Sequence, residues 1–269
     1  MMTMTALPLN NIDLYCALMM GEIVPYYQPL INSRTQRLYG LEILMRWSLS
    51  EENVSPLALI RAFDENGLLP EMTQHLLRQV AADINELDAV LPEGLHLSLN
   101  VSPSQVAKPG FVFDTLSFLA AIPLEKYTLV VEVTEEQPLP STPEVTGAFL
   151  KLQLAGVEIY LDDFGTGCSN LAYLEQFSVD GVKIDQLFVK HLSSDKATTS
   201  IAARVADLAK ARGLGIIAEG VETPEQSQLL RDMGIVIQQG YLFSCALSRS
   251  QLREYLAARR LHFQMKNRE

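Results

Sequence analysis

Polar side chains follow short apolar runs at seven places along this chain, and most of them carry oxygen donors. Each run is rich in Val, Ile and Leu, as a buried strand would be. The polar residues that follow are Glu42, Asn100, Glu132, Asp162 with Asp163, Lys183, Glu219 and Gln239. Carboxylate and amide oxygens suit hard divalent cations better than zinc or copper. The set therefore predicts a magnesium or manganese site, provided that the fold brings these residues together.

The prediction of a metal site depends on these residues meeting at one place in the fold. A single polar residue at a strand end is usually the first residue of a solvated loop. Five carboxylates gathered in one place would repel one another by roughly 4 kcal/mol per pair at 4 Å and an effective dielectric constant near 20. Bound cations are the simplest compensation for that repulsion.

The adjacent acids Asp162 and Asp163 indicate which chemistry such cations would support. One carboxylate can bridge two ions while its neighbour holds the second, and two ions about 4 Å apart can bind a phosphodiester and activate water. Lys183 could orient that water or stabilise charge on the phosphate. The guanidinium of Arg46, four residues after Glu42, has the geometry to bind phosphate, although an ordinary surface ion pair is the alternative for it.

Histidines are not expected to join this set. His75, His191 and His262 lie on predicted helices or beside them, and His96 lies well before the end of its strand. We expect each of them to be a surface or packing residue.

Composition limits the class of protein. The chain has 269 residues, is 48% hydrophobic and carries a formal charge of −11, which argues against binding duplex nucleic acid through a broad basic face. Its three cysteines lack metal-binding spacing, as expected in a reducing compartment. The apolar N-terminal stretch is short and contains Asp13 and Glu22, so it predicts a packed helix and not a signal peptide or a membrane span. A cytoplasmic location follows as an expectation.

The elements that must position these residues alternate between strands and helices. Predicted strands cover 23–31, 38–46, 95–101, 127–133, 157–162, 179–184, 214–219 and 235–239. The turn between the first two is too short for a crossover helix, so they should form an antiparallel hairpin. Ser55-Pro56, Thr142-Pro143 and Thr223-Pro224 each predict the start of a helix. The pattern predicts an α/β fold, a TIM-like (β/α)8 barrel with an antiparallel first strand, formed by one domain over 1–269.

Seven motifs together resemble the EAL domain family, from about Gly21 to Leu256. Their order along the chain makes the resemblance specific. The motifs are GLEILMRW (40–47), SLNVSP (98–103), VVEVTE (130–135), YLDDFGTGCSNL (160–171), VKIDQLFV (182–189), IIAEGVET (216–223) and QGYLF (239–243).

This resemblance implies a metal-dependent hydrolysis of cyclic-di-GMP to linear pGpG, with Mg²⁺ or Mn²⁺ as cofactor, two ions, a homodimer, and a role in the bacterial switch between motile and sessile life. By motif, a first metal would be held by Glu42, Asn100, Glu132 and Asp162, and a second by Asp162 and Asp163 with Glu219 nearby. Lys183 would position the attacking water, Glu135 would brace the DDFGTG loop, and Glu219 would take part in catalysis. Gln28, Arg46 and Gln239 would contact the substrate.

Several positions depart from the family pattern. Ile43 replaces the alanine of the family's name and should point away from the site, while Cys168, Asn170 and Ala246 bear on the loop and the dimer more than on the chemistry. Gly165 and Gly167 would let the loop swing near the metals, or could simply form a tight turn.

Two alternatives to this hydrolase remain open. One is a catalytically silent EAL module that acts as a cyclic-di-GMP receptor or a protein-binding regulator. The other is an enzyme that acts on a different cyclic or linear dinucleotide.

Overall fold

The computed structural model describes residues 11–48, 55–134, 138–165, 170–190, 192 and 196–266. Eight strands close into a barrel in the order of the sequence. The strands are β1 (Ile23–Asn32), β2 (Arg37–Trp47), β3 (Leu95–Val101), β4 (Tyr127–Val133), β5 (Glu158–Phe164), β6 (Gly181–Ile184), β7 (Gly215–Ala218) and β8 (Ile237–Gln238). The predicted positions of all eight strands are confirmed to within a few residues.

The first strand runs against the others. β1 pairs antiparallel with β2 on one side and with β8 on the other, while the remaining neighbours pair in parallel. The predicted (β/α)8 barrel with an antiparallel first strand is therefore confirmed. The reversal follows from the turn after Asn32, which leaves no room for a crossover helix.

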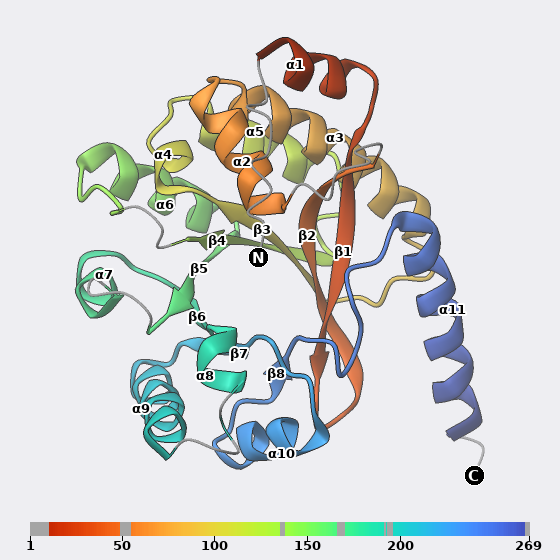
Figure 1. Ribbon diagram of the computed structural model, residues 1–269, viewed down its shortest axis with the longest axis vertical. Helices are drawn as coiled ribbons and strands as arrows, with labels where there is room; N and C mark the ends of the chain where they lie inside the picture. Colours follow the sequence, from red (N-terminus) through yellow and green to blue (C-terminus); the bar gives the residue numbers. More distant parts are fainter. Residues whose placement is uncertain are drawn as a thin grey trace, which may run out of the picture.

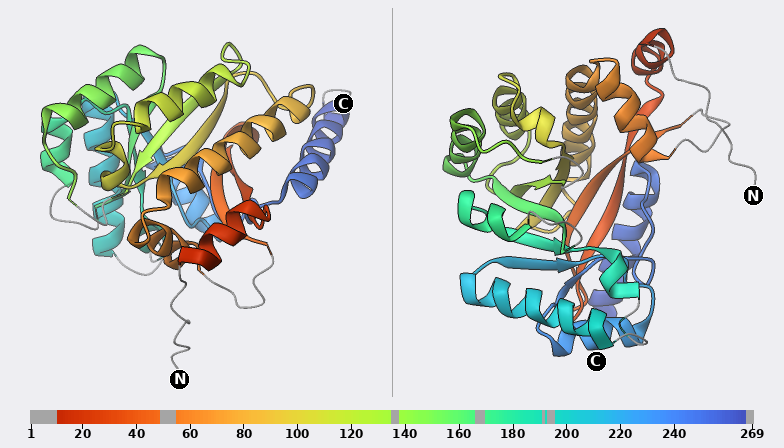
Figure 2. Two further views of the ribbon diagram at one scale, coloured as in Figure 1. Left: turned by 90° about the horizontal axis from the view of Figure 1, so that it is seen from above. Right: turned by 60° about the vertical axis from the view of Figure 1, so that its left-hand side comes forward.

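Helices surround the barrel, as Figure 1 shows. They are α1 (Asn11–Met19), α2 (Pro56–Glu65), α3 (Leu69–Leu87), α4 (Pro103–Val106), α5 (Phe111–Ala120), α6 (Pro143–Leu154), α7 (Asn170–Gln176), α8 (Gln186–Lys190), α9 (Lys196–Arg212), α10 (Pro224–Asp232) and α11 (Arg249–Lys266). The last helix returns to pack alongside β1 (Figure 2). Within the part of the chain that the structure describes, every helix is too short or too polar to cross a bilayer.

The predicted helix starts are made by side-chain caps. Ser55, Thr142 and Thr223 each accept a hydrogen bond from the backbone amide three residues later, and a proline stands at the first helical position in each case. Proline lacks the amide hydrogen that would be unpaired there, and its fixed φ matches the helix. These caps therefore fix where α2, α6 and α10 begin.

Apolar residues fill two separate regions. A large cluster lies between the strands and the helices. A small cluster consists of Leu30, Val130, Tyr160 and Ile217, and Tyr39 and Ile237 pack against it. Ile43 belongs to the large cluster, whereas its neighbour Glu42 lines a cleft at the barrel mouth. The expectation that Ile43 points away from the site is confirmed, as strand alternation requires.

Candidate active site

The predicted polar residues meet at the carboxyl ends of the parallel strands. Strand register places Gln28 directly across from Glu42, and Asn100 across from Glu132. An open cleft of about 240 Å³ lies here. It is lined by Gln28, Glu42, Leu44, Asp162, Gln186, Glu219, Gly220, Glu222, Gln239, Gly240 and Tyr241. The mouth of a (β/α)8 barrel is where such folds carry their active sites.

The interpretation of Glu42 as a strand-end residue is wrong. The predicted strand 38–46 already extends past it, and β2 continues five residues further, to Trp47. The parallel pairing of β2 with β3 extends only from Gly40 to Ile43, and beyond it the strand continues only as the partner of β1. Glu42 thus lies at the level of the mouth even though its strand does not end there.

Lys183 lies at the centre of the acidic residues and is fully buried. Its ammonium nitrogen is 2.7 Å from Glu132 Oε2, 3.5 Å from Asp162 Oδ1 and 3.6 Å from Glu42 Oε1, and it also pairs with Glu219. One buried cation thus faces four carboxylates. The ammonium alone cannot neutralise them when all four are ionised, so the cluster carries an excess of negative charge.

Two amides orient the carboxylate of Glu42. Asn100 Nδ2 donates to Glu42 Oε1 at 2.5 Å, and Gln239 Nε2 donates to Glu42 Oε2 at 2.5 Å. Burial disfavours the ionised carboxylate, but Lys183 and the two amide donors outweigh it and hold the pKa of Glu42 below its usual value. Glu42 is therefore kept as an anion with a fixed orientation.

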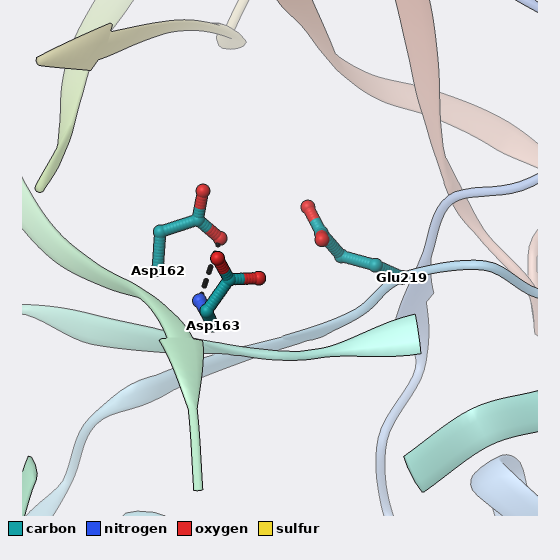
Figure 3. Close-up of side chains that lie close together, drawn as sticks. All are labelled: Asp162, Asp163 and Glu219. Carbon is teal, nitrogen blue, oxygen red and sulfur yellow. Dashed lines mark hydrogen bonds between the residues drawn. The ribbon is translucent and has the colours of Figure 1, made fainter. Parts of the chain in front are cut away.

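Asp162, Asp163 and Glu219 form a second group of oxygens, shown in Figure 3. One carboxylate oxygen from each lies within 4.8 Å of the others. In a regular strand Asp162 and Asp163 would point to opposite faces. Asp163 instead has φ of 54°, and the pairing of β5 with β6 shifts register between Leu161 and Phe164. This local irregularity brings both acids to the mouth.

The pKa values of the neighbouring acids reflect crowding. Burial, with the charges of Glu42 and Asp162, raises the pKa of Glu132 to about 8 in spite of Lys183. Burial and the carboxylates of Asp162 and Asp185 raise the pKa of Asp163 to about 7. Burial also raises the pKa of Asp162 and of Glu219. The protein therefore gathers more negative charge here than it can stabilise by its own groups.

The donor set fits divalent cations. Glu132 Oε1 and Gln239 Oε1 are buried and accept no hydrogen bond, which leaves each oxygen with an unused lone pair. The group Asp162, Asp163 and Glu219 supplies carboxylate oxygens at a spacing that one ion could bridge. Oxygen donors of this kind suit Mg²⁺ or Mn²⁺.

Of the three residues expected to contact substrate, two line the cleft and one lies beside it. Gln28 and Gln239 line the cleft. Arg46 is half-buried, with its guanidinium 5.8 Å from the centre of the Tyr26 ring, and it donates to the Met45 carbonyl. Burial lowers the pKa of Arg46, while the nearby carboxylate of Glu42 acts in the opposite direction. Arg46 therefore lies beside the cleft lining, on the same face of the hairpin as Gln28 and Glu42.

Glu135 lies outside the described residues, as do Thr166 and Gly167 of the DDFGTG loop and Cys168 after it. Gly165 is described, with φ of 105°, and a Cβ there would lie 2.9 Å from the Phe188 ring. Both the backbone angle and the close approach require glycine at this position. Whether the loop moves stays a prediction.

Two acids near the site were missed by sequence reasoning. Asp185 interacts with Asp163, and Glu222 lines the cleft. Their positions in the sequence could have indicated both of them. Asp185 lies two residues after Lys183, and Glu222 lies three residues after Glu219, within the same motifs. Tyr241, which is 75% exposed and lines the cleft, was also not singled out.

The histidines that the structure describes in detail have packing roles. His96 stacks on Tyr39 with ring centres 4.2 Å apart, and His75 contacts Gln79 on the same helix. His191 and the side chain of His262 lie outside the described residues. The expectation that His75 and His96 are packing or surface residues agrees with these contacts.

Comparison with protein families gives a match over most of the chain. The model of the EAL domain matches residues 13–246, a little further toward the N-terminus than the motifs indicated. The chain is 42% identical over 224 residues to the probable cyclic di-GMP phosphodiesterase PdeG of Escherichia coli, covering 83% of this chain and 44% of PdeG. It is 37% identical to the cyclic di-GMP phosphodiesterase PdeL of the same organism, covering 83% of this chain and 62% of PdeL. The chain thus spans less than two thirds of the length of either relative.

Solved structures share the fold. The EAL enzyme Bd1971, with cAMP and cyclic-di-GMP bound, superposes with a TM-score of 0.82 at 26% identity, over 91% of this chain and 67% of that one. A manganese and cyclic-di-GMP complex of BlrP1 from Klebsiella pneumoniae superposes with a TM-score of 0.73 at 25% identity, over 85% of this chain and 57% of that one.

Proposed function

The chain belongs to the EAL domain family, and on that premise we propose that it hydrolyses one phosphodiester bond of cyclic-di-GMP to give linear pGpG. The observation that carries the proposal is the group of four carboxylates around Lys183 at the barrel mouth, with unused oxygens on Glu132 and Gln239. Relatives named as cyclic di-GMP phosphodiesterases support the choice of substrate.

The proposal assigns Mg²⁺ or Mn²⁺ as cofactor, with two ions. The first would be held by Glu42, Asn100, Glu132 and Asp162, and the second by Asp162 and Asp163 with Glu219. When bound, such ions supply positive charge for the phosphate oxygens and lower the pKa of a bound water. The manganese present in the BlrP1 complex supports this choice of metal.

The chain's own residues would position the reactants. The carboxylates around Lys183 outweigh its burial and hold its pKa well above the usual value, so it remains an ammonium and acts as a hydrogen-bond donor to the attacking water. A carboxylate, for which we propose Glu219, would then accept the proton of that water. The water oxygen would form a bond to phosphorus, the bond from phosphorus to the leaving sugar oxygen would break, that oxygen would take up a proton from solvent water, and Glu219 would release the proton it accepted to solvent. Gln28, Arg46 and Gln239 would hold the substrate, and Glu135 would brace the neighbouring loop.

We extend the proposal to a single EAL domain over 1–269 that acts as a homodimer in the bacterial cytoplasm and lowers the level of the second messenger. Sedimentation analysis of the purified chain would test the dimer.

The direct test is to incubate the purified chain with cyclic-di-GMP and Mg²⁺ or Mn²⁺ and to follow pGpG by chromatography, with a chelator as control. We expect pGpG only when the metal is present. Binding of cyclic-di-GMP without product would instead indicate a silent receptor. Faster cleavage of another dinucleotide in a parallel incubation would change the assigned substrate. A chain that shows no binding and no cleavage of cyclic-di-GMP would overturn the proposal.

A further inference from the structure

After β8 the chain passes the cleft and returns along β1 before α11 begins. We call residues 240–248 the strap. No side chain in 241–250 is buried, and Tyr241 at the start of the strap lines the cleft. Leu242, Phe243 and Leu247 of the strap are half-buried and pack against the edge of the core, so the position of the strap depends on this packing together with a few polar contacts.

The Leu242 amide donates to the Val221 carbonyl at 3.0 Å, and the other polar contacts attach the strap to β1. Tyr27 and Leu247 exchange both backbone hydrogen bonds, at 2.8 and 2.9 Å, and form an isolated antiparallel bridge. The next residue, Gln28, donates from its side chain to the Ser244 carbonyl at 3.3 Å. Because β8 pairs with β1 only through Ile31 and Asn32, the contact at Tyr27 extends the closure of the barrel toward the mouth.

The side chain of Tyr27 is bound on the other face of β1. It is fully buried, and its hydroxyl donates to Asp83 Oδ2 on α3 at 2.6 Å. Asp83 is 8% exposed, and its other oxygen lies 3.5 Å from Arg249 Nη1. Arg249 is the first residue of α11 and directly follows the strap. Asp83 therefore interacts with β1 beneath the strap and with the helix at its end.

We propose that Tyr27 and Asp83 are positioning residues that fix the strap against β1 and so set the place of Gln28 and Tyr241 in the substrate cleft. The effect on substrate rests on the proposed function. Loss of the Tyr27 hydroxyl removes a donor from a buried carboxylate, which then competes for other donors. The strap gains freedom, and substrate binding weakens while the metal-binding acids remain in place.

The test compares the full chain with Tyr27→Phe, which removes the hydroxyl alone. We expect KM for cyclic-di-GMP to rise roughly three- to tenfold, the factor of one net hydrogen bond, with kcat changed less than twofold. Hydrogen exchange followed by mass spectrometry should show faster exchange of peptides that cover 240–248. Peptides that cover β4 (127–133) should be unchanged.

Glu86→Gln is the matched control. Glu86 lies one turn after Asp83 on α3 and pairs with Arg249 and Arg253 at the exposed end of the same network. Exposed ion pairs contribute little, so KM and exchange should match the wild type. If Tyr27→Phe does not fold, Asp83→Ala, which removes the acceptor of the Tyr27 hydroxyl, should show the same rise in KM.

A lower Tm without a change in KM or in exchange of 240–248 would overturn the proposal, because the contact would then only stabilise the fold. Faster exchange at unchanged KM would overturn the link to substrate. A wild-type chain that neither binds nor cleaves cyclic-di-GMP would instead overturn the proposed function, and the exchange measurement would still decide whether Tyr27 and Asp83 anchor the strap.

Discussion

Lys183 Nζ lies 2.7 Å from Glu132 Oε2, and neither side chain is exposed to solvent. Such a pair is costly to bury and is retained only where its geometry or function requires it. Here Glu42, Asp162 and Glu219 approach the same ammonium, so the pair is the centre of a cluster with excess negative charge. This relationship leads to predictions about metal, pH and substitution.

Replacement of Glu42 by Gln should lower the rate of hydrolysis about 100-fold or more. The carboxylate of Glu42 is expected to hold the first metal, and both Asn100 and Gln239 orient it. Initial rates of pGpG formation measure the effect. Glu175→Gln is the control, since the Glu175 side chain is 75% exposed. Full activity of the Glu42 variant would contradict the assignment of this residue.

Replacement of Lys183 by Met should destabilise the metal-free protein by about 3–5 kcal/mol, because it leaves buried carboxylates without their cation. Urea unfolding with a chelator present measures this loss. Added Mn²⁺ should then raise the Tm of the variant more than that of the wild type, since the ions would replace the missing charge. An equal rise in Tm for both proteins would argue against a shared role of the lysine and the metal.

The stability of the metal-free protein should fall as pH rises from about 5 to 8. The pKa of Glu132 is raised to about 8, so the folded state holds a proton that the unfolded state has already lost in this range. The free energy of unfolding should then decrease by up to about 1.4 kcal/mol per pH unit from this group. Urea titrations at several pH values measure the slope.

Glu132→Gln supplies the control for that experiment, because it keeps the shape of the side chain and cannot titrate. The slope between pH 5 and 8 should become shallower in this variant. A metal-free wild type whose stability increases across the same range would show that the carboxylates ionise without cost.

Gly181→Ala should destabilise the fold by about 1–3 kcal/mol through overpacking. A Cβ at this position would lie 2.4 Å from the Tyr160 ring, which is itself buried. Gly147→Ala is the matched control on α6, where a Cβ meets nothing within 4 Å. That change should stabilise the protein by about 0.5–1 kcal/mol, because alanine is the better helix former. Thermal unfolding of the two variants should therefore shift in opposite directions.

The sequence by itself determined the barrel and named most of the polar residues that meet at its mouth. Continuous apolar runs, capped helix starts and the short turn after Asn32 predict eight strands with the first one reversed, because each of these signals is local. Glu42, Asn100, Glu132, Asp162, Lys183, Glu219 and Gln239 could be named for the same reason, since parallel strands present their carboxyl ends at one edge.

Tertiary structure alone decided how these groups act on one another. The φ of 54° at Asp163 breaks strand alternation and brings two adjacent acids to the same side, which no pattern of residue types expresses. The burial of Lys183 among four carboxylates and the contact of Tyr27 with Asp83 join residues 21 to 141 positions apart. Distances of this kind follow from packing of the whole barrel, because the chain must close before these charges and hydroxyls can meet.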